Sequence, residues 1–419
     1  MYESEFLKLK EIIFKFPSNR LLYAIFICYI AFFYPIIAIY NQYTNQGTNN
    51  VSLFYRSTTF IISFVIIFRE GILKKNRPIP AGMGLLIIFW IYYLIKLLYD
   101  ILILGLIQNP LLSASYYLLQ TIGIAFINML SFYLIGKKID YSLISRFLFI
   151  LLVIINILII TSFLNTYGLN ITAYASMRLG IASEETNIEY MNSISIGVYS
   201  SFLLILILYK KKFKLIYLFF IIIALFNLLV SASQGPLISL IAVILLLFIS
   251  KRPRVNVKFI IFLIVSIFAI LFIYTSGIIN DFFIFQRLSN IDQNASSNER
   301  ISFLKSALNQ IEENVIFGTH YYVLEDKSSP HNIFIDIILT TGLFGLGLII
   351  YPMFNFLKLI FNNILQNPIL AISFFYFCMA QFSGYVYGLL DFWPLMGLLL
   401  SNHLNPNTGQ MGKKIILNQ

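Results

Sequence analysis

Cysteine, histidine and charged residues are scarce in this sequence. Its 419 residues include two cysteines and three histidines, and only 11% are charged. Both cysteines, Cys28 and Cys378, lie inside apolar stretches, which excludes a disulfide framework and a thiolate metal site. Because 59% of the residues are hydrophobic, a soluble fold would hold far more apolar surface than it can bury. The composition therefore excludes a soluble domain and predicts a membrane protein.

The apolar residues are gathered into stretches long enough to cross a bilayer, for which about 20 residues are needed. We predict an all-α polytopic membrane protein with about 12 transmembrane helices. The expected spans are 21–40, 51–68, 83–107, 111–135, 143–164, 192–209, 213–230, 236–250, 259–277, 332–357, 368–388 and 392–402. Before the first span, apolar residues recur at helical spacing among lysines, which indicates an interfacial amphipathic helix.

Lysine and arginine are missing from alternate connections between the spans. The short segments 41–50, 108–110, 231–234 and 389–391 contain neither residue, whereas the intervening segments are basic. Basic segments face the cytoplasm, so we expect both termini there. The net charge of +11 lies mostly beside spans, where anionic lipid attracts it, and no nucleic-acid partner is expected.

Two outward loops are much longer than the other outward connections, 165–191 between spans five and six and 280–331 between spans nine and ten. Long ordered loops commonly carry function. In the larger loop, a capping box at 296–299 precedes an apolar stripe over 301–315, and Gly318 supplies a stop. These signals predict an amphipathic helix that lies on the membrane helices like a lid.

The expected organisation has five parts. They are a cytoplasmic interfacial segment 1–20, spans one to nine in 21–279, the large outer loop 280–331, spans ten to twelve in 332–402 and a cytoplasmic tail 403–419.

Outward-facing cations are few. They are Arg178, Arg287, Arg300, Lys305 and Lys327, with Arg56 just inside an outward helix end. Arg300 is expected in the first turn of the loop helix, where it opposes the helix dipole and so needs a partner or a task. Two of the three histidines lie in the same loop: His331 precedes the tenth span, and His320 is expected to be solvated or a helix cap.

Residues of both loops match a family pattern. The local match consists of Arg300, Gly318, Pro330-His331-Asn332-Ile333-Phe334 and Gly342 with Gly345, together with Arg178-Leu179-Gly180 and Asn187 in the shorter loop. This pattern resembles the Wzy-type polysaccharide polymerases and the related O-antigen ligases of bacterial inner membranes. Where the ligases tend to show Ser-Arg-Gly, this chain has Ser233-Gln234-Gly235-Pro236, which favours a polymerase.

The resemblance implies transfer of a glycan from undecaprenyl pyrophosphate to a sugar hydroxyl of a second lipid-linked repeat unit, on the periplasmic face. Guanidinium groups can meet the charge of the departing pyrophosphate with paired hydrogen bonds, so Arg178 and Arg300 are the catalytic candidates. Neutral histidine suits a base or an orienter for the acceptor hydroxyl, which points to His331. The substrate-binding candidates are Arg287, Arg56 and Asn332. A chain-length regulator and a flippase are implied as partners, beside the membrane lipid.

No metal or cofactor is expected, because pyrophosphate is already a good leaving group and no Asp-x-Asp pair occurs in an outward segment. A less favoured alternative is a metal site formed by His320, Glu325, Asp326 and His331. Reserve candidates for the base are Glu184, Glu185 and Glu189.

Two other functions stay open. One is an O-antigen ligase that uses a lipid A core as acceptor. The other is a lipid-linked oligosaccharide flippase, because Lys96 and Asp100 lie four residues apart on one face of the third span, and charges at membrane depth are commonly functional. We favour a structural ion pair between the two residues over an ion-coupling role.

Overall fold

The computed structural model describes residues 20–44, 48–72, 79–108, 114–168, 181–182, 189–210, 214–250, 295–384, 386–389 and 391–401. The predicted interfacial segment (apart from Arg20), the ninth span and the cytoplasmic tail lie outside these residues.

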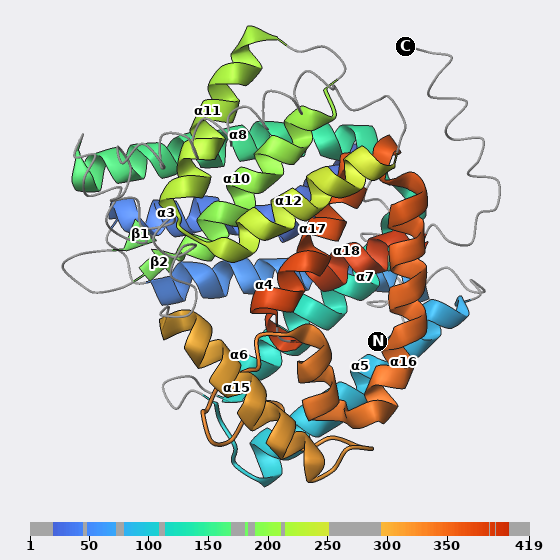
Figure 1. Cartoon of the computed structure of the whole chain (residues 1–419). Helices are drawn as coiled ribbons and strands as arrows, with labels where there is room; N and C mark the ends of the chain where they lie inside the picture. Colours follow the sequence, from blue (N-terminus) through green and yellow to red (C-terminus); the bar gives the residue numbers. More distant parts are fainter. Residues whose placement is uncertain are drawn as a thin grey trace, which may run out of the picture.

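The described residues are almost entirely helical (Figure 1). The α-helices are α2 (Arg20–Phe32), α3 (Tyr34–Thr44), α4 (Thr48–Ile67), α5 (Ala81–Leu98), α6 (Ala114–Leu118), α7 (Ile127–Ile135), α8 (Tyr141–Tyr167), α10 (Ser193–Leu208), α11 (Leu215–Val230), α12 (Gln234–Ile249), α15 (Ala295–Glu312), α16 (Ile333–Asn363), α17 (Pro368–Ser383) and α18 (Phe392–Leu400). The π-helical turns are η1 (Phe68–Ile72), η2 (Tyr99–Ile103) and η3 (Leu119–Phe126), and the 3-10 turns are η4 (Gly136–Lys138), η6 (Ile364–Gln366) and η7 (Val386–Gly388). Between α8 and α10, β1 (Ile181–Ala182) and β2 (Glu189–Met191) pair antiparallel.

Four helical segments within the described residues are long and apolar enough to cross a membrane: Ala81–Ile103, Ala114–Lys138, Tyr141–Asn165 and Ile333–Gln366. The pair Arg20–Ile30 and Tyr34–Tyr40, bent by 54°, makes a fifth if it is one span. Further apolar helices are shorter than a full span. The structure thus supports a multi-pass membrane protein, and the twelve-span topology stays a prediction.

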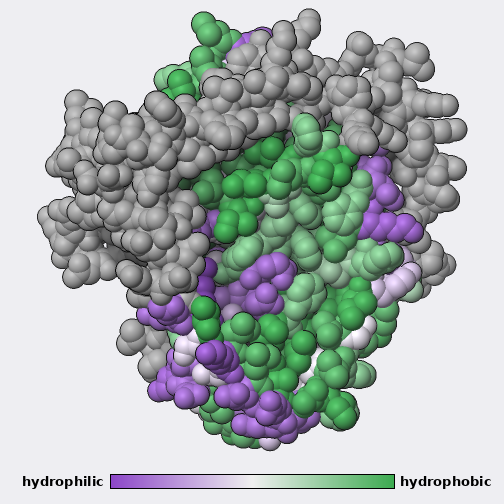
Figure 2. Space-filling model, in the orientation of Figure 1, coloured by the Kyte–Doolittle hydropathy of each residue, from purple (hydrophilic) through white to green (hydrophobic). Residues whose placement is uncertain are grey.

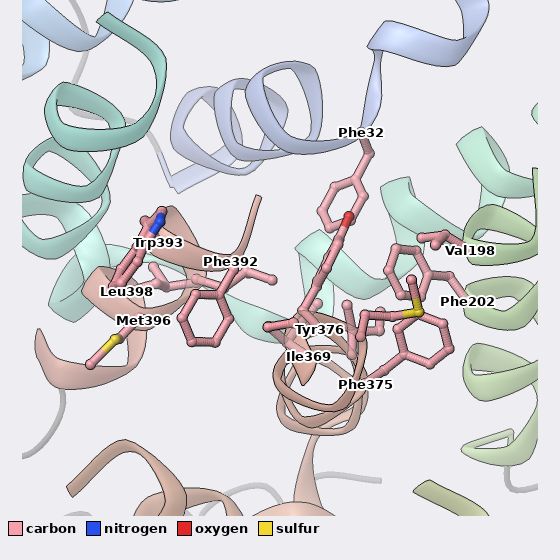
Figure 3. Close-up of a cluster of buried hydrophobic side chains, with 14 of the residues drawn as sticks. Phe32, Val198, Phe202, Ile369, Phe375, Tyr376, Phe392, Trp393, Met396 and Leu398 are labelled. Carbon is pink, nitrogen blue, oxygen red and sulfur yellow. The ribbon is translucent and has the colours of Figure 1, made fainter. Parts of the chain in front are cut away.

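The core is centred on α10, whose side chains are buried nearly all round, as expected for a helix that is apolar on every face. The Phe202 ring meets those of Phe375 and Tyr376 from α17, with centroids 5.1 and 5.0 Å apart (Figure 3). The ring of Trp393 in α18 packs edge-on against the ring of Trp90 in α5, with centroids 5.1 Å apart. Outer faces of several helices instead leave large apolar side chains exposed, which suits contact with lipid tails.

Helix α15 lies at the far side of the molecule from α8 and α11 (Figure 1). It packs on α16 through Ala307 and Ile311, which are buried against Val323 and Leu339. Part of the predicted stripe, Ile301, Leu308 and Val315, remains exposed, because the packed face is rotated toward Ala307. Hydrophilic residues gather around α15 and the segment after it, whereas apolar residues dominate much of the remaining coloured face (Figure 2).

Residues 313–332, which we call the return loop, connect α15 to α16. They cross α16 where that helix is broken at Gly342, whose φ is 66°. The carbonyls of Val315 and Ile316 accept hydrogen bonds from the N–H groups of Leu343 and Phe344, at 2.9 and 3.0 Å. The loop therefore satisfies backbone donors that the break leaves open.

Glycine is required on both sides of this crossing. Gly318 has a φ of 74°, and a Cβ there would collide with the Thr340 carbonyl. A Cβ at Gly342 would collide with the Ile316 carbonyl. Gly318 was expected to stop the loop helix, but α15 already ends at Glu312, so its conformation serves the crossing instead.

Candidate functional site

Two side chains of α5 hold the first half of the return loop. The Tyr92 hydroxyl donates to the Phe317 carbonyl at 2.8 Å, and the Lys96 ammonium donates to the Gly318 carbonyl at 3.2 Å. Both contacts lie beside the crossing with α16, so the loop is fixed to two membrane helices at once.

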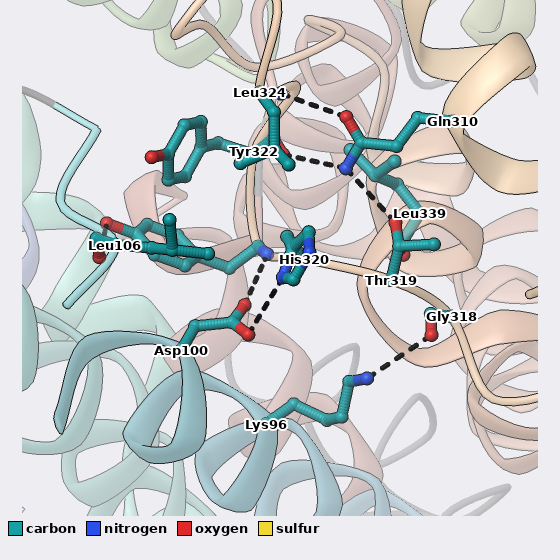
Figure 4. Close-up of polar contacts among 11 residues, drawn as sticks. Lys96, Asp100, Leu106, Gln310, Gly318, Thr319, His320, Tyr322, Leu324 and Leu339 are labelled. Carbon is teal, nitrogen blue, oxygen red and sulfur yellow. Dashed lines mark hydrogen bonds and ion pairs between the residues drawn. The ribbon is translucent and has the colours of Figure 1, made fainter. Parts of the chain in front are cut away.

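Asp100 of η2 holds the next two residues of the loop (Figure 4). Its Oδ1 lies 3.0 Å from His320 Nδ1, and its Oδ2 accepts a 2.9 Å hydrogen bond from the Tyr321 N–H. Asp100 is fully buried, and a buried carboxylate is costly unless it is paired and hydrogen-bonded. The loop supplies both kinds of partner.

This arrangement corrects the expected ion pair between Lys96 and Asp100. Each group has its own partner in the return loop, Gly318 for the first and His320 for the second. It also corrects the view of His320 as a solvated residue or a cap, because its Nδ1 meets a buried carboxylate. The side chain of His320 keeps 23% of its surface exposed.

Gln310 of α15 fixes the middle of the return loop. Its Nε2 donates to Thr319 Oγ1 and to the Tyr322 carbonyl, at 3.1 and 3.2 Å, and its Oε1 accepts from the Leu324 N–H at 2.9 Å (Figure 4). The amide is buried and makes all three bonds with one segment. It therefore sets the position of the loop relative to α15.

His331 and Arg300 are brought together at the start of α16. The His331 ring lies 6.1 Å from the Phe303 ring of α15 and is partly buried. Burial, followed by the positive charge of Arg300, lowers the pKa of His331 below its ordinary value of 6.5. The imidazole is therefore neutral at physiological pH. His331 has a φ of 56°, a left-handed conformation that is uncommon for residues other than glycine and that occurs at functional sites.

Arg300 differs in one respect from its expected position. Because α15 begins at Ala295, Arg300 lies past the first helical turn, where the dipole argument for a task loses its force. What singles it out instead is its effect on His331.

Asn332 caps α16. Its side-chain oxygen accepts hydrogen bonds from Phe334 N and Ile335 N at 3.0 and 3.2 Å, and its Nδ2 donates to the Gln381 carbonyl at 3.3 Å. The amide that was expected to bind substrate thus has a structural task in the described residues. It fixes the helix start directly after His331.

Arg56 of α4 lies in a neighbouring group of aromatic side chains. Its guanidinium is 4.7 Å from the centroid of the Tyr116 ring, and Nη2 donates to the Tyr116 hydroxyl at 3.5 Å. The centroid of the Tyr117 ring lies 5.7 Å from that of Tyr116, and the Tyr321 ring lies 5.8 Å from that of Tyr117. Arg178, Asn187 and Arg287 lie outside the described residues.

Two carboxyl groups were missed by the sequence analysis. Asp336, one turn into α16, is fully buried; its Oδ2 accepts from Val386 N at 2.7 Å, and its Oδ1 has no hydrogen-bond partner among the described residues. Asp391 accepts a 2.7 Å hydrogen bond from the Tyr376 hydroxyl. Burial raises the pKa of Asp391 to about 7, against the opposing effect of the Tyr376 hydrogen bond. A charge within an apolar run was the available signal for Asp336.

The described residues contain no group of three or more histidine, cysteine or carboxylate side chains placed to hold a metal ion. The alternative metal site of His320, Glu325, Asp326 and His331 is therefore not assembled in this part of the chain. What is assembled is a membrane helix bundle whose return loop carries two histidines, each beside a charged group.

These features are those of a multi-pass membrane protein with polar residues gathered along the return loop. Residues 219–350 match the family model Wzy_C, described as O-antigen ligase. The matched range includes Arg300, the return loop and the break in α16. This match supports the resemblance of the chain to the O-antigen polymerase and ligase superfamily. No curated protein sequence matches it significantly.

Proposed function

We propose that this protein is an O-antigen polymerase, a glycosyltransferase that builds surface polysaccharide. It transfers a glycan from undecaprenyl pyrophosphate to the sugar hydroxyl of a second undecaprenyl-pyrophosphate-linked repeat unit. The observation that carries the proposal is the family match over residues 219–350, a segment in which burial and the charge of Arg300 lower the pKa of His331 at the start of α16.

The proposed reaction requires a cationic group for the leaving pyrophosphate and a hydrogen-bonding group for a substrate oxygen. Negative charge develops on the pyrophosphate as it departs, and Arg300, with Arg178 and Arg287 from the two outer loops, supplies guanidinium groups for it. His331, kept neutral by its surroundings, can hydrogen-bond a substrate oxygen as donor or acceptor. Arg56 is a further candidate for binding the substrate, through its position beside Tyr116. The reaction requires no metal, because the leaving group is already good.

The proposal includes a topology. The chain crosses the bacterial inner membrane about 12 times, with both termini in the cytoplasm and the site on the periplasmic face. The lipid tails of both substrates stay in the bilayer. A flippase supplies the substrates, and a chain-length regulator acts as a further partner.

The second candidate function is an O-antigen ligase, which the description of the matching family favours. The segment Ser233-Gln234-Gly235-Pro236, without the arginine typical of ligases, favours the polymerase. A flippase is less well supported, because Lys96 and Asp100 are engaged in holding the return loop.

The test is to incubate the purified protein with one lipid-linked repeat unit in the presence of a chelator and to analyse the product on a gel. A ladder of polymer supports the proposal, including its independence of metal. A product that forms only when lipid A core is added would identify a ligase. If neither assay gives a product and the protein transports the lipid-linked unit in vesicles, it is a flippase.

A further inference from the structure

The two histidines of the return loop have charged neighbours of opposite sign. His331 lies near the guanidinium of Arg300, whereas His320 contacts the Asp100 carboxylate at 3.0 Å. A proton taken up by His331 would form a cation near a cation. His320 Nδ1 instead faces the Asp100 carboxylate, the arrangement in which a carboxylate orients a histidine base during proton transfer.

The hydrogen bond to Asp100 also orients the imidazole. With Nδ1 facing the carboxylate, Nδ1 carries the hydrogen and Nε2 is left as the acceptor on the opposite side of the ring (Figure 4). Asp100 is itself held by the Tyr321 N–H. The partly exposed side chain of His320 thus presents a proton acceptor from a rigid support.

The histidines occupy different places along α15. His331 lies by Phe303, and the loop around His320 is fixed by Gln310. Seven residues of α-helix separate these contacts, which is about 10 Å along the axis. In an in-line displacement the attacking and leaving oxygens lie on opposite faces of one anomeric carbon. A hydrogen bond of about 3 Å beyond each oxygen gives the two histidines a separation of this order, so each can serve a different oxygen.

We propose that His320 Nε2 accepts the proton of the acceptor hydroxyl, with Asp100 as its positioning residue, and that Arg300 and His331 contact the departing pyrophosphate. This assignment rests on the proposed polymerase function. It moves the role of base from His331, the candidate identified from the sequence, to His320, which was expected to be solvated or a helix cap.

The bond changes balance without a co-reactant. The acceptor oxygen bonds to the anomeric carbon of the donor sugar. The bond from that carbon to the phosphate oxygen breaks, and its electron pair leaves with the lipid pyrophosphate. The hydroxyl proton passes to His320 and then to solvent.

Other ionisable groups near Asp100 are compatible with this role. They are Lys96, Tyr93, Tyr321 and Tyr322. The ammonium of Lys96 is held at the Gly318 carbonyl, 3.2 Å away.

Glutamine substitutions test the assignment, because a glutamine side chain can still hydrogen-bond but cannot take up the proton. We expect His320→Gln to lower the single-turnover rate of glycan transfer by about 100-fold, the scale of general-base catalysis. His331→Gln should lower it by only about tenfold, since the amide retains a donor for the pyrophosphate. The matched control is Glu325→Gln, an exposed residue of the same loop, which should transfer at the wild-type rate.

A second measurement separates proton transfer from structure. Imidazole added to the buffer should restore part of the activity of His320→Ala, and Asp100→Asn should lower the rate of the enzyme without preventing this rescue in the double variant. A normal rate for His320→Gln, a larger loss for His331→Gln than for His320→Gln, or His320→Ala unaffected by imidazole would each overturn the assignment. If the wild type makes no polymer, the proposed function itself fails, which is a distinguishable result.

Discussion

Arg300 of α15 is the charged residue that, in addition to burial, lowers the pKa of His331, directly before α16. Its charge contributes to keeping His331 neutral, and the proposed reaction places both against a pyrophosphate. We expect Arg300→Ala to lower the rate of polymerisation by an order of magnitude or more, roughly the loss of one charge-stabilising group. Arg300→Lys should recover only part of the rate, because an ammonium lacks the planar fork of donors.

The matched control for Arg300 is Lys305→Ala, which removes an exposed cation from the same helix. The rate of ladder growth on gels measures both. Full-length polymer made at the normal rate by Arg300→Ala, at normal protein levels, would remove this arginine from the site.

Asp391 should make the fold less stable as pH rises. Its carboxyl keeps its proton in the folded state up to a pKa of about 7, whereas the unfolded chain releases it near the ordinary value of 3.8. Between these values the free energy of unfolding falls, by at most about 1.4 kcal/mol per pH unit from this group.

The variant Asp391→Asn has no ionisable carboxyl group at this position. In detergent, the melting temperature of the variant relative to wild type should therefore rise from pH 5 to pH 7 and change little above. A difference that stays constant across this range would show that Asp391 ionises normally in the folded protein.

At the scale of residues, sequence reasoning could identify charges at unusual depth but not their partners. The spacing of Lys96 and Asp100 suggests that they meet, since side chains four apart on a helix are neighbours. The carboxylate instead meets His320, more than two hundred positions away, and only the fold can supply such a partner. His331 was identified because it is part of the family pattern, whereas His320 has no local signal.

The crossing of the return loop with α16 is the element on which the site depends. Gly342→Ala should lower the free energy of unfolding by at least about 2 kcal/mol, through the positive φ and the collision with the Ile316 carbonyl. Gly347→Ala is the matched control, because it lies in the same helix and its added Cβ meets nothing within 4 Å.

Melting temperatures of the two glycine variants in detergent, with polymer ladders from the same preparations, test the crossing. We expect Gly342→Ala to lose both stability and activity. Gly347→Ala should melt at or slightly above the wild-type temperature, as is usual when alanine replaces an exposed helical glycine. Equal melting temperatures for the two would show that the close approach at Gly342 does not matter.

Elements were predictable where an apolar run is long and uninterrupted. The third, fifth and tenth predicted spans coincide in large part with α5, α8 and α16. The first predicted span is instead bent by 54° between α2 and α3, and hydropathy carries no information on such bends. The eleventh predicted span ends early, because α17 stops at Ser383 and Gly388 lies in the separate turn η7.

At the scale of the whole molecule, the testable quantity is which side of the membrane each connection faces. In a background of Cys28→Ser and Cys378→Ser, a cysteine at Glu313, which is exposed on the return loop, should react with an impermeant maleimide added to intact spheroplasts. A cysteine at Lys137, exposed in a basic connection, should react only after permeabilisation. Labelling of the Lys137 site in intact spheroplasts would contradict the proposed orientation and indicate the opposite one.

The broken α16 sets a condition on how substrates reach the site. The hydrogen bonds from Leu343 and Phe344 to the return loop both close the helix break and hold the loop. Swinging the loop aside would break both hydrogen bonds, at a cost of about 0.5–1.5 kcal/mol each. Opening the loop would therefore disrupt the same hydrogen bonds that close the break in α16. Lipid-linked substrates are therefore expected to slide in sideways from the bilayer, beneath a loop that stays shut during turnover.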